Sequence, residues 1–191
     1  YGTHPYVLLN YQGTLHDVFT LAHEMGHALH SWYSDEHQPY IYAGYRIFVA
    51  EVASTCNEAL LIHYLMEQSK KAVDRKKTMY LMNYFLEQFR TTLFRQTMFA
   101  EFEKITHGLQ EQGETLTADR LCEIYYDLNK LYFGEEICVD QEIAMEWARI
   151  PHFYTPFYVY QYATGFSAAI ALSKQILEQG APAVEQYKKF L

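Results

Sequence analysis

The sequence predicts a mainly α-helical protein with one short β-strand at its N-terminal end. Apolar residues recur every three or four positions through most of the chain, which is the spacing of one face of a helix. Glycine and proline interrupt this pattern in the short stretches between the predicted helices. Residues 4–11 differ, because they form a run of apolar and aromatic side chains between Gly2 and Gly13. Such a run is typical of a strand.

The helix after this strand is predicted over residues 15–34. Thr14 suits its N-cap, and Asp17 suits its first turn, where a negative charge offsets the positive end of the helix dipole. The same periodicity and capping signals predict further helices at about 46–68, 74–107, 117–133, 143–148, 158–178 and from Pro182 onward.

The connections between these helices have their own signals. Gly108 is expected to end the 74–107 helix, and Thr117 to cap the next one. Two prolines predict a loop over residues 151–156. A basic cluster is expected to form a solvated turn and helix start, at Lys70, Lys71, Arg75, Lys76 and Lys77.

Composition restricts the class of protein. Half of the 191 residues are hydrophobic and there is no repeat or clear linker, so residues 1–191 are interpreted as one helical unit. A net charge of −8 argues against nucleic acid as a partner, since phosphate binding needs a basic surface. No apolar run is long enough to span a membrane. Three scattered cysteines without C-x-x-C spacing favour a reducing compartment, and hence the cytoplasm.

The chemistry is indicated by His23-Glu24-Met25-Gly26-His27, an H-E-x-x-H motif within the first predicted helix. At 3.6 residues per turn, His23 and His27 project from one face and can reach one zinc ion. Glu24 lies about 100° away from His23 around the helix. It is poorly placed as a ligand, but it can contact a water held on the metal.

Catalytic zinc usually takes three protein ligands and leaves one position open. Glu51, on the second predicted helix, is the best candidate for the third ligand because its apolar neighbours would leave a carboxylate in need of a charged partner. A carboxylate at the edge of the core, paired with a base, is the alternative.

Other residues near the motif receive more modest interpretations. His16 and His30 could contact the ligands, although a satisfied or solvent-facing histidine is the simpler expectation. Glu58 lies two turns after Glu51 and could orient a ligand imidazole. Cys56 is expected to be a small buried hydrophobic residue.

Three ordered blocks of sequence resemble the oligoendopeptidase F group within the thimet oligopeptidase family of zinc metallopeptidases. They are His-Pro-Tyr-Val-Leu-Leu-Asn-Tyr at 4–11, His23–His27 together with Phe48–Ser54, and the tyrosine-rich stretch 152–162. The resemblance implies a multi-helical zincin-type catalytic domain and an endopeptidase that cleaves short, unstructured peptides. It implies one Zn²⁺ per chain.

The resemblance also implies roles for particular residues. The zinc ligands would be His23, His27 and Glu51, and Glu24 would be the general base. The third block would lie over the metal, so that His152, Tyr158 and Tyr160 assist the reaction. The spacing from His152 to these tyrosines differs from that of thimet-type relatives, which leaves Tyr154 as a reserve candidate.

Members of this family are much longer than 191 residues, so residues 1–191 are expected to be a C-terminal part of the catalytic domain. Surface intended for the remaining part would then be exposed or used for self-association. Three alternatives follow. The chain could be an inactive piece or a helical interaction module that retains the metal motif. It could be a zinc hydrolase for other substrates. It could be a di-iron helical bundle, which is weak because no second Glu-x-x-His is present.

Overall fold

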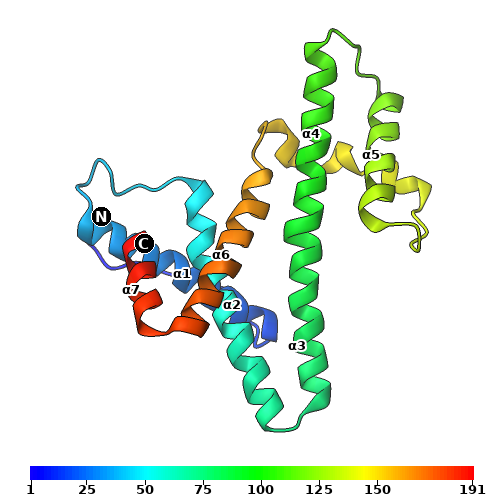
Figure 1. Cartoon of the computed structure of the whole chain (residues 1–191). Coiled ribbons are helices and arrows are strands. Elements are labelled where there is room, and N and C mark those ends of the chain that lie inside the picture. Colours follow the sequence, from blue (N-terminus) through cyan, green and yellow to red (C-terminus); the bar gives the residue numbers. More distant parts are fainter. The chain divides into compact units, whose positions relative to one another are not determined.

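The computed structural model describes all of residues 1–191, and helices account for most of the chain (Figure 1). The α-helices and the shorter π and 3-10 segments, labelled η, follow one another in this order: α1 (Leu15–His37), α2 (Ile47–Lys71), α3 (Arg75–Gln88), the π-helical η1 (Phe89–Phe94), α4 (Arg95–Glu111), α5 (Ala118–Phe133), the 3-10 helices η2 (Gln141–Arg149) and η3 (Pro151–Tyr154), α6 (Tyr160–Gln179) and α7 (Ala181–Phe190).

The β-strand predicted over residues 4–11 is wrong, because these residues have no regular secondary structure. A strand satisfies its backbone through a neighbouring strand, and the chain contains no second strand to pair with it. Tyr6 and Leu8, whose apolar character suggested the strand, are exposed at 82% and 96%. The segment is therefore an irregular, largely exposed stretch.

Most of the predicted helices are confirmed, with boundaries that shift by a few residues. The helix predicted over 74–107 is interrupted by the π-helical η1, and the one predicted over 143–148 is the 3-10 helix η2. Thr14 and Asp17 form a capping box at the start of α1: the Thr14 N–H donates to the Asp17 carboxylate at 2.8 Å, and the Asp17 N–H donates to the Thr14 hydroxyl at 3.3 Å. Thr117 caps α5 with a single side-chain hydrogen bond, which its hydroxyl accepts from the Arg120 N–H.

Two predicted connections differ from the structure. α4 continues past Gly108 to Glu111, and the turn is made by Gly113, whose φ of +83° suits a residue without a Cβ. Residues 151–154 form the 3-10 helix η3 rather than a loop. Pro151 is at its first position, where a missing N–H costs no hydrogen bond.

The chain divides into two compact units. Unit 1 contains residues 1–88 and 164–191, and unit 2 contains residues 89–163. Both boundaries fall inside helical stretches, between α3 and η1 and within α6. A boundary inside a helix has no glycine-rich or polar linker, which explains why the sequence pattern shows none.

Unit 1 is built on the crossing of α1 and α2, supported by α3 on one side and by α6 and α7 on the other. Phe19, Ile62 and Leu81 form one core cluster, between α1, α2 and α3. A second cluster joins Val52 and Cys56 of α2 to the two C-terminal helices through Ala169 and Tyr187. In Figure 1, α7 and the C-terminus lie beside α1.

Unit 2 has its own core of aromatic side chains. Phe99 and Phe102 of α4 pack around Tyr125 of α5, with ring centroids 6.3 Å and 5.2 Å from the Tyr125 ring. Below this core, the Tyr125 hydroxyl donates to the Glu146 carboxylate at 2.7 Å, and the Arg95 guanidinium donates to the same carboxylate at 2.6 Å. The buried carboxylate is thus paired, as burial of a charge requires.

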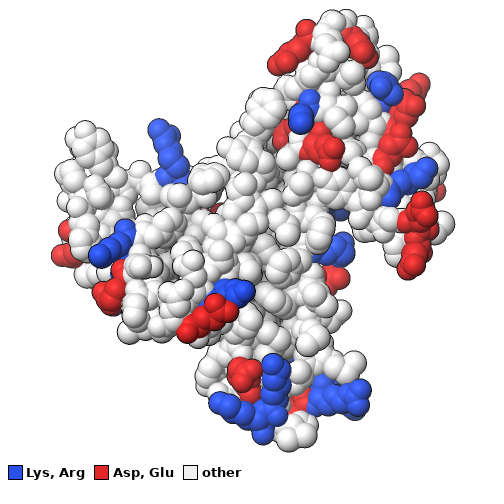
Figure 2. Space-filling model, viewed as in Figure 1, with Lys and Arg blue, Asp and Glu red and all other residues white.

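The basic cluster is located as predicted. Its five side chains are exposed around the turn between α2 and α3, and they form the dense group of Lys and Arg near the bottom of Figure 2. None of the helices combines the length and apolar character needed to cross a membrane.

Candidate metal centre

The α1–α2 crossing brings the predicted metal ligands together. His23 and His27 lie one turn apart on α1, and Glu51 lies on α2. The helices approach closely at Gly26, where an added Cβ would lie 2.4 Å from the Ser54 Cα. A glycine at this position is therefore what allows the Glu51 carboxylate to reach the two imidazoles.

The three side chains converge on one point. The Nε2 atoms of His23 and His27 are 3.1 Å apart, and the Glu51 Oε2 atom is 3.3 Å from the first and 3.9 Å from the second. Ligand atoms that bind zinc tetrahedrally at about 2.0–2.1 Å are roughly 3.3 Å from one another. Two imidazole nitrogens and one carboxylate oxygen at these separations fit a catalytic zinc ion. His23, His27 and Glu51 thus form a group that could hold a metal ion.

The electrostatics of the site favour a cation. Burial alone would lower the pKa of His23, but hydrogen bonds and charges from Glu51 and Glu58 outweigh it and raise that pKa to about 10. The hydrogen bond with His23 is also the main reason that the pKa of Glu51 is lowered, against the effect of burial. A pocket that stabilises a positive imidazolium in this way provides the field that a bound metal ion requires.

Residues around the ligands fix their orientation. Glu58 accepts a hydrogen bond from the His23 Nδ1 at 2.5 Å, which confirms the predicted contact and leaves the Nε2 atom facing the other ligands. The Ser54 hydroxyl donates to the Glu51 Oε2 at 3.2 Å. The Asn57 amide donates to the Ala22 carbonyl at 3.2 Å and so ties α2 to α1 beside the site.

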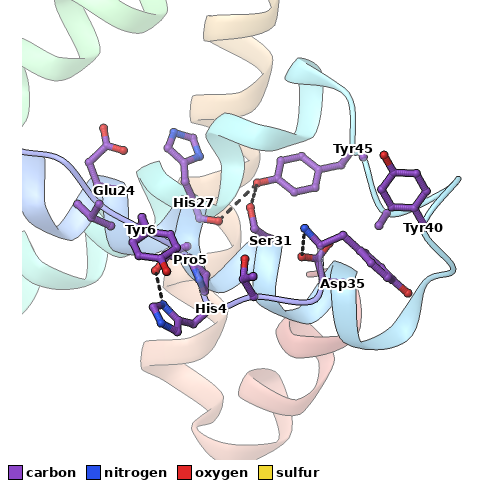
Figure 3. A pocket seen from close by; sticks show the side chains of 15 residues that line it. His4, Pro5, Tyr6, Glu24, His27, Ser31, Asp35, Tyr40 and Tyr45 are labelled. Carbon is purple, nitrogen blue, oxygen red and sulfur yellow. Dashed lines mark hydrogen bonds and ion pairs between the residues drawn. The ribbon is translucent and has the colours of Figure 1, made fainter.

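Glu24 and His27 line a cleft of 690 Å³, a volume within the usual range for ligand sites. Figure 3 shows both side chains extending from α1 toward the same side. The Glu24 carboxylate has no hydrogen bond or ion pair with the protein, so it is available to a ligand in the cleft. Other walls of the cleft come from the extended N-terminal segment and the loop before α2, through Tyr1, Thr3, His4, Pro5, Tyr6, Val7, Tyr40, Ala43, Gly44 and Tyr45.

The remaining histidines of α1 stay outside the ligand group. His16 is exposed. His30 is 3% exposed, its ring stacks on Tyr45 at 3.7 Å, and burial lowers its pKa to about 4. Cys56 is fully buried in the α2 core, as predicted, and burial raises the pKa of its thiol to about 11.

His152, Tyr158 and Tyr160 belong to unit 2 or its margin, whereas the metal ligands belong to unit 1. The His152 ring lies 5.9 Å from the Tyr158 ring and 6.0 Å from the Tyr162 ring, so these three form an aromatic cluster. Tyr160 begins α6 and is 44% exposed, and Tyr154 is 88% exposed. The role of this block toward the metal stays a prediction.

Two features of the site were missed by sequence reasoning. Gly26 sets the distance between the helices, and a lone glycine inside a helical pattern was the available signal. Tyr45 lines the cleft, and its hydroxyl hydrogen-bonds the Ser31 hydroxyl at 2.8 Å and donates to the His27 carbonyl at 3.4 Å. Nothing in the sequence marked Tyr45 among 18 tyrosines.

Comparison with known proteins shows that the chain is similar to bacterial proteins named as oligopeptidases and oligoendopeptidases. It is 56% identical to Oligopeptidase PepF of Bacillus subtilis (strain 168), over all of this chain and 28% of that protein. It is 47% identical to the chromosomal Oligoendopeptidase F of Lactococcus lactis subsp. cremoris, over all of this chain and 31% of that protein. The chain thus spans less than a third of the length of these relatives.

A solved structure gives the same result. The crystal structure of oligoendopeptidase-F from Enterococcus faecium matches 91% of this chain and 30% of its own, with a TM-score of 0.77 at 45% identity. The model of the family described as Peptidase family M3 matches residues 2–191. The match covers nearly the whole chain, including the H-E-x-x-H helix and the helix that supplies Glu51. The chain therefore belongs to peptidase family M3.

Proposed function

We propose that this chain carries the zinc centre of a metalloendopeptidase that hydrolyses internal bonds of short, unstructured peptides. The convergence of His23, His27 and Glu51 within 3.1–3.9 Å, beside a carboxylate that the protein leaves unpaired, is the observation that supports it. The names of the relatives from Bacillus subtilis and Lactococcus lactis support the substrate class. One Zn²⁺ per chain would be held by the three ligands.

Zinc, when bound, lowers the pKa of a coordinated water toward neutrality and polarises a carbonyl group. The chain's own contribution begins with Glu24, whose carboxylate takes a proton from the attacking water as the new C–O bond forms. The same carboxyl then gives that proton to the leaving amine as the C–N bond breaks. Glu58 holds His23 through its Nδ1 during these steps and keeps the ligand in place.

His152, Tyr158 and Tyr160 are proposed to stabilise the intermediate. Negative charge develops on the former carbonyl oxygen, and neutral donors such as a phenol hydroxyl or an imidazole N–H match it without adding a competing charge. Tyr154 remains the reserve candidate for this role.

The proposed substrate follows from the cleft. A peptide backbone has many donors and acceptors, and one wall of the cleft is formed by residues 1 and 3–7, which have no regular secondary structure. Tyrosines supply further contact area with hydroxyls that can hydrogen-bond peptide groups. A site of this kind favours extended peptides of varied sequence. The proposal also includes a cytoplasmic location. It further includes self-association through exposed apolar side chains such as Leu8 and Ile41.

The test compares the chain with its Glu24→Gln variant. Zinc is measured by elemental analysis, and cleavage is followed with a quenched fluorescent peptide, using the full-length Bacillus subtilis relative as a positive control for the substrate. We expect near one zinc per chain in both forms and a loss of about 10²–10⁴-fold in hydrolysis for Glu24→Gln. Glu36→Gln, an exposed change on the same helix, is the matched control and should behave as the unmodified chain.

The outcomes separate the alternatives. Absence of bound zinc, or undiminished cleavage by Glu24→Gln, would contradict the proposed chemistry. Zinc at one per chain without cleavage by the unmodified chain would favour an inactive piece or an interaction module that retains the metal motif. Cleavage of ester or amide compounds in preference to peptides would favour a different zinc hydrolase.

A further inference from the structure

Glu103 is a buried carboxylate in unit 2 that neither the zinc chemistry nor the core explains. It lies on α4 and is 3% exposed. Its Oε1 atom accepts one hydrogen bond, from the backbone N–H of Phe157 at 2.9 Å. Its Oε2 atom has no hydrogen-bond partner. Buried polar groups are almost always satisfied, so a half-satisfied carboxylate held inside a core calls for a specific reason.

Phe157 is the second unusual residue. Its φ is +58°, in the left-handed region that a bulky residue rarely adopts. Such a conformation persists where surrounding contacts enforce it, and it is concentrated at functional sites. The backbone N–H that Glu103 holds belongs to this same strained residue.

α4 holds Phe157 at two points. Glu103 binds its backbone, and His107, one turn later on the same face of α4, packs against its ring at 4.7 Å between centroids. The pKa of Glu103 is raised, because burial outweighs the Phe157 N–H and the nearby His107, which both act to lower it. The carboxyl oxygen accepts the N–H in either protonation state, so this contact needs no charge.

The strained residue lies within the stretch that carries the candidate catalytic groups of unit 2, residues 152–160, called here the tyrosine segment. Phe153 anchors its first half, with its ring 5.5 Å from Phe99 and 5.4 Å from Phe102. Val159, 1% exposed, anchors its end. Phe157 lies between them, and because it is 53% exposed it is held mainly through its backbone N–H, which donates to Glu103. The direction of the backbone at Phe157 sets the positions from which Tyr158 and Tyr160 extend.

We propose that Glu103 is a positioning residue for the tyrosine segment: its carboxylate holds Phe157 in the left-handed conformation and thereby fixes the arrangement of His152, Tyr158 and Tyr160. The contribution of this arrangement to peptide hydrolysis rests on the proposed function. The hold on Phe157 itself does not, because both residues belong to unit 2.

Hydrogen exchange followed by mass spectrometry tests the hold without any need for activity. Glu103→Leu removes the acceptor but keeps an apolar side chain in the core, and we expect exchange of the peptide covering residues 152–160 to accelerate about tenfold or more. Glu103→Gln keeps an acceptor oxygen and should stay within about twofold of the unmodified chain. Phe157→Pro removes the donor and excludes a positive φ, so it should accelerate exchange of the same peptide to a similar extent. It tests the same contact if Glu103→Leu folds poorly.

Where the chain cleaves peptides, Glu103→Leu should lower kcat about tenfold, with KM and zinc content unchanged, and Glu103→Gln should restore kcat. Unchanged exchange in Glu103→Leu and Phe157→Pro, or equal damage by Glu103→Gln and Glu103→Leu, would overturn the proposal. Faster exchange in a chain that cleaves no peptide supports the hold on Phe157 and counts against the proposed function alone.

Discussion

At the scale of single residues, both ring nitrogens of His23 have partners in the candidate metal centre. Its Nδ1 donates to Glu58, and its Nε2 faces Glu51 and His27. Because Glu58 binds Nδ1, Nε2 is the ring nitrogen left to present a lone pair to a metal once the metal displaces its proton. In the proposed centre, Glu58 would therefore act on the metal through His23 rather than by contact.

Removal of Glu58 tests this arrangement. Glu58→Ala leaves the His23 ring free to rotate and to change tautomer, so we expect zinc affinity to fall about 10- to 100-fold. Competition with a chromophoric chelator measures the change. Glu67→Ala is the matched control, because Glu67 is exposed on the same helix and pairs with exposed Lys70. Equal affinity in Glu58→Ala and the unmodified chain would contradict the orienting role.

At the scale of helices, the site depends on how closely α1 and α2 approach. Neither helix alone contains all three ligands, so the ligand geometry is a consequence of helix packing. Gly26 and Ser54 form the point of contact, and Asn57 adds a hydrogen bond across it. Gly165 of α6 differs from Gly26, because a Cβ added there would lie 3.8 Å from the Glu51 Cβ, an ordinary van der Waals distance.

Gly26→Ala tests the crossing. Alanine has a higher helix propensity than glycine. At position 26, however, its Cβ would overlap the backbone of α2, which cannot move aside as a flexible side chain can. We expect the free energy of unfolding to fall by about 1–3 kcal/mol, and zinc binding to weaken as Glu51 moves away. Urea unfolding and elemental analysis measure the two effects.

Gly108→Ala is the matched control for this change. Gly108 is also inside a helix, but an added Cβ there meets nothing within 4 Å. The substitution should raise the free energy of unfolding by up to about 1 kcal/mol and leave zinc binding unchanged. A similar response of the two glycine positions would show that the crossing does not depend on Gly26.

The sequence predicted the helices well, because apolar periodicity and capping are local properties. Thr14 and Thr117 show this directly. It also predicted which three side chains would converge, because His23 and His27 are fixed by one helix and Glu51 is the suitable carboxylate on the next. It failed for residues 4–11, since a strand depends on a distant partner that local pattern does not reveal. Contacts such as that of Glu103 with Phe157, 54 positions apart, were equally invisible.

At the scale of the whole molecule, the residues of the proposed chemistry are divided between the two units. All three predicted zinc ligands and Glu24 lie in unit 1, whereas His152 and Tyr158 lie in unit 2. The division matters because metal loading and stabilisation of the intermediate become separable properties. It also gives the tyrosine segment its own structural support, from α4, independent of the α1–α2 crossing.

His152→Ala tests this separation in the intact chain. The substitution removes one proposed donor to the intermediate and leaves every zinc ligand in place, so turnover should fall about 10²–10³-fold while zinc content stays near one per chain. Peptide cleavage and elemental analysis on the same preparation measure both. His37→Ala, at the exposed end of α1, is the histidine control and should change neither. Loss of zinc from His152→Ala would make His152 a metal ligand instead, and the centre would then draw its ligands from both units.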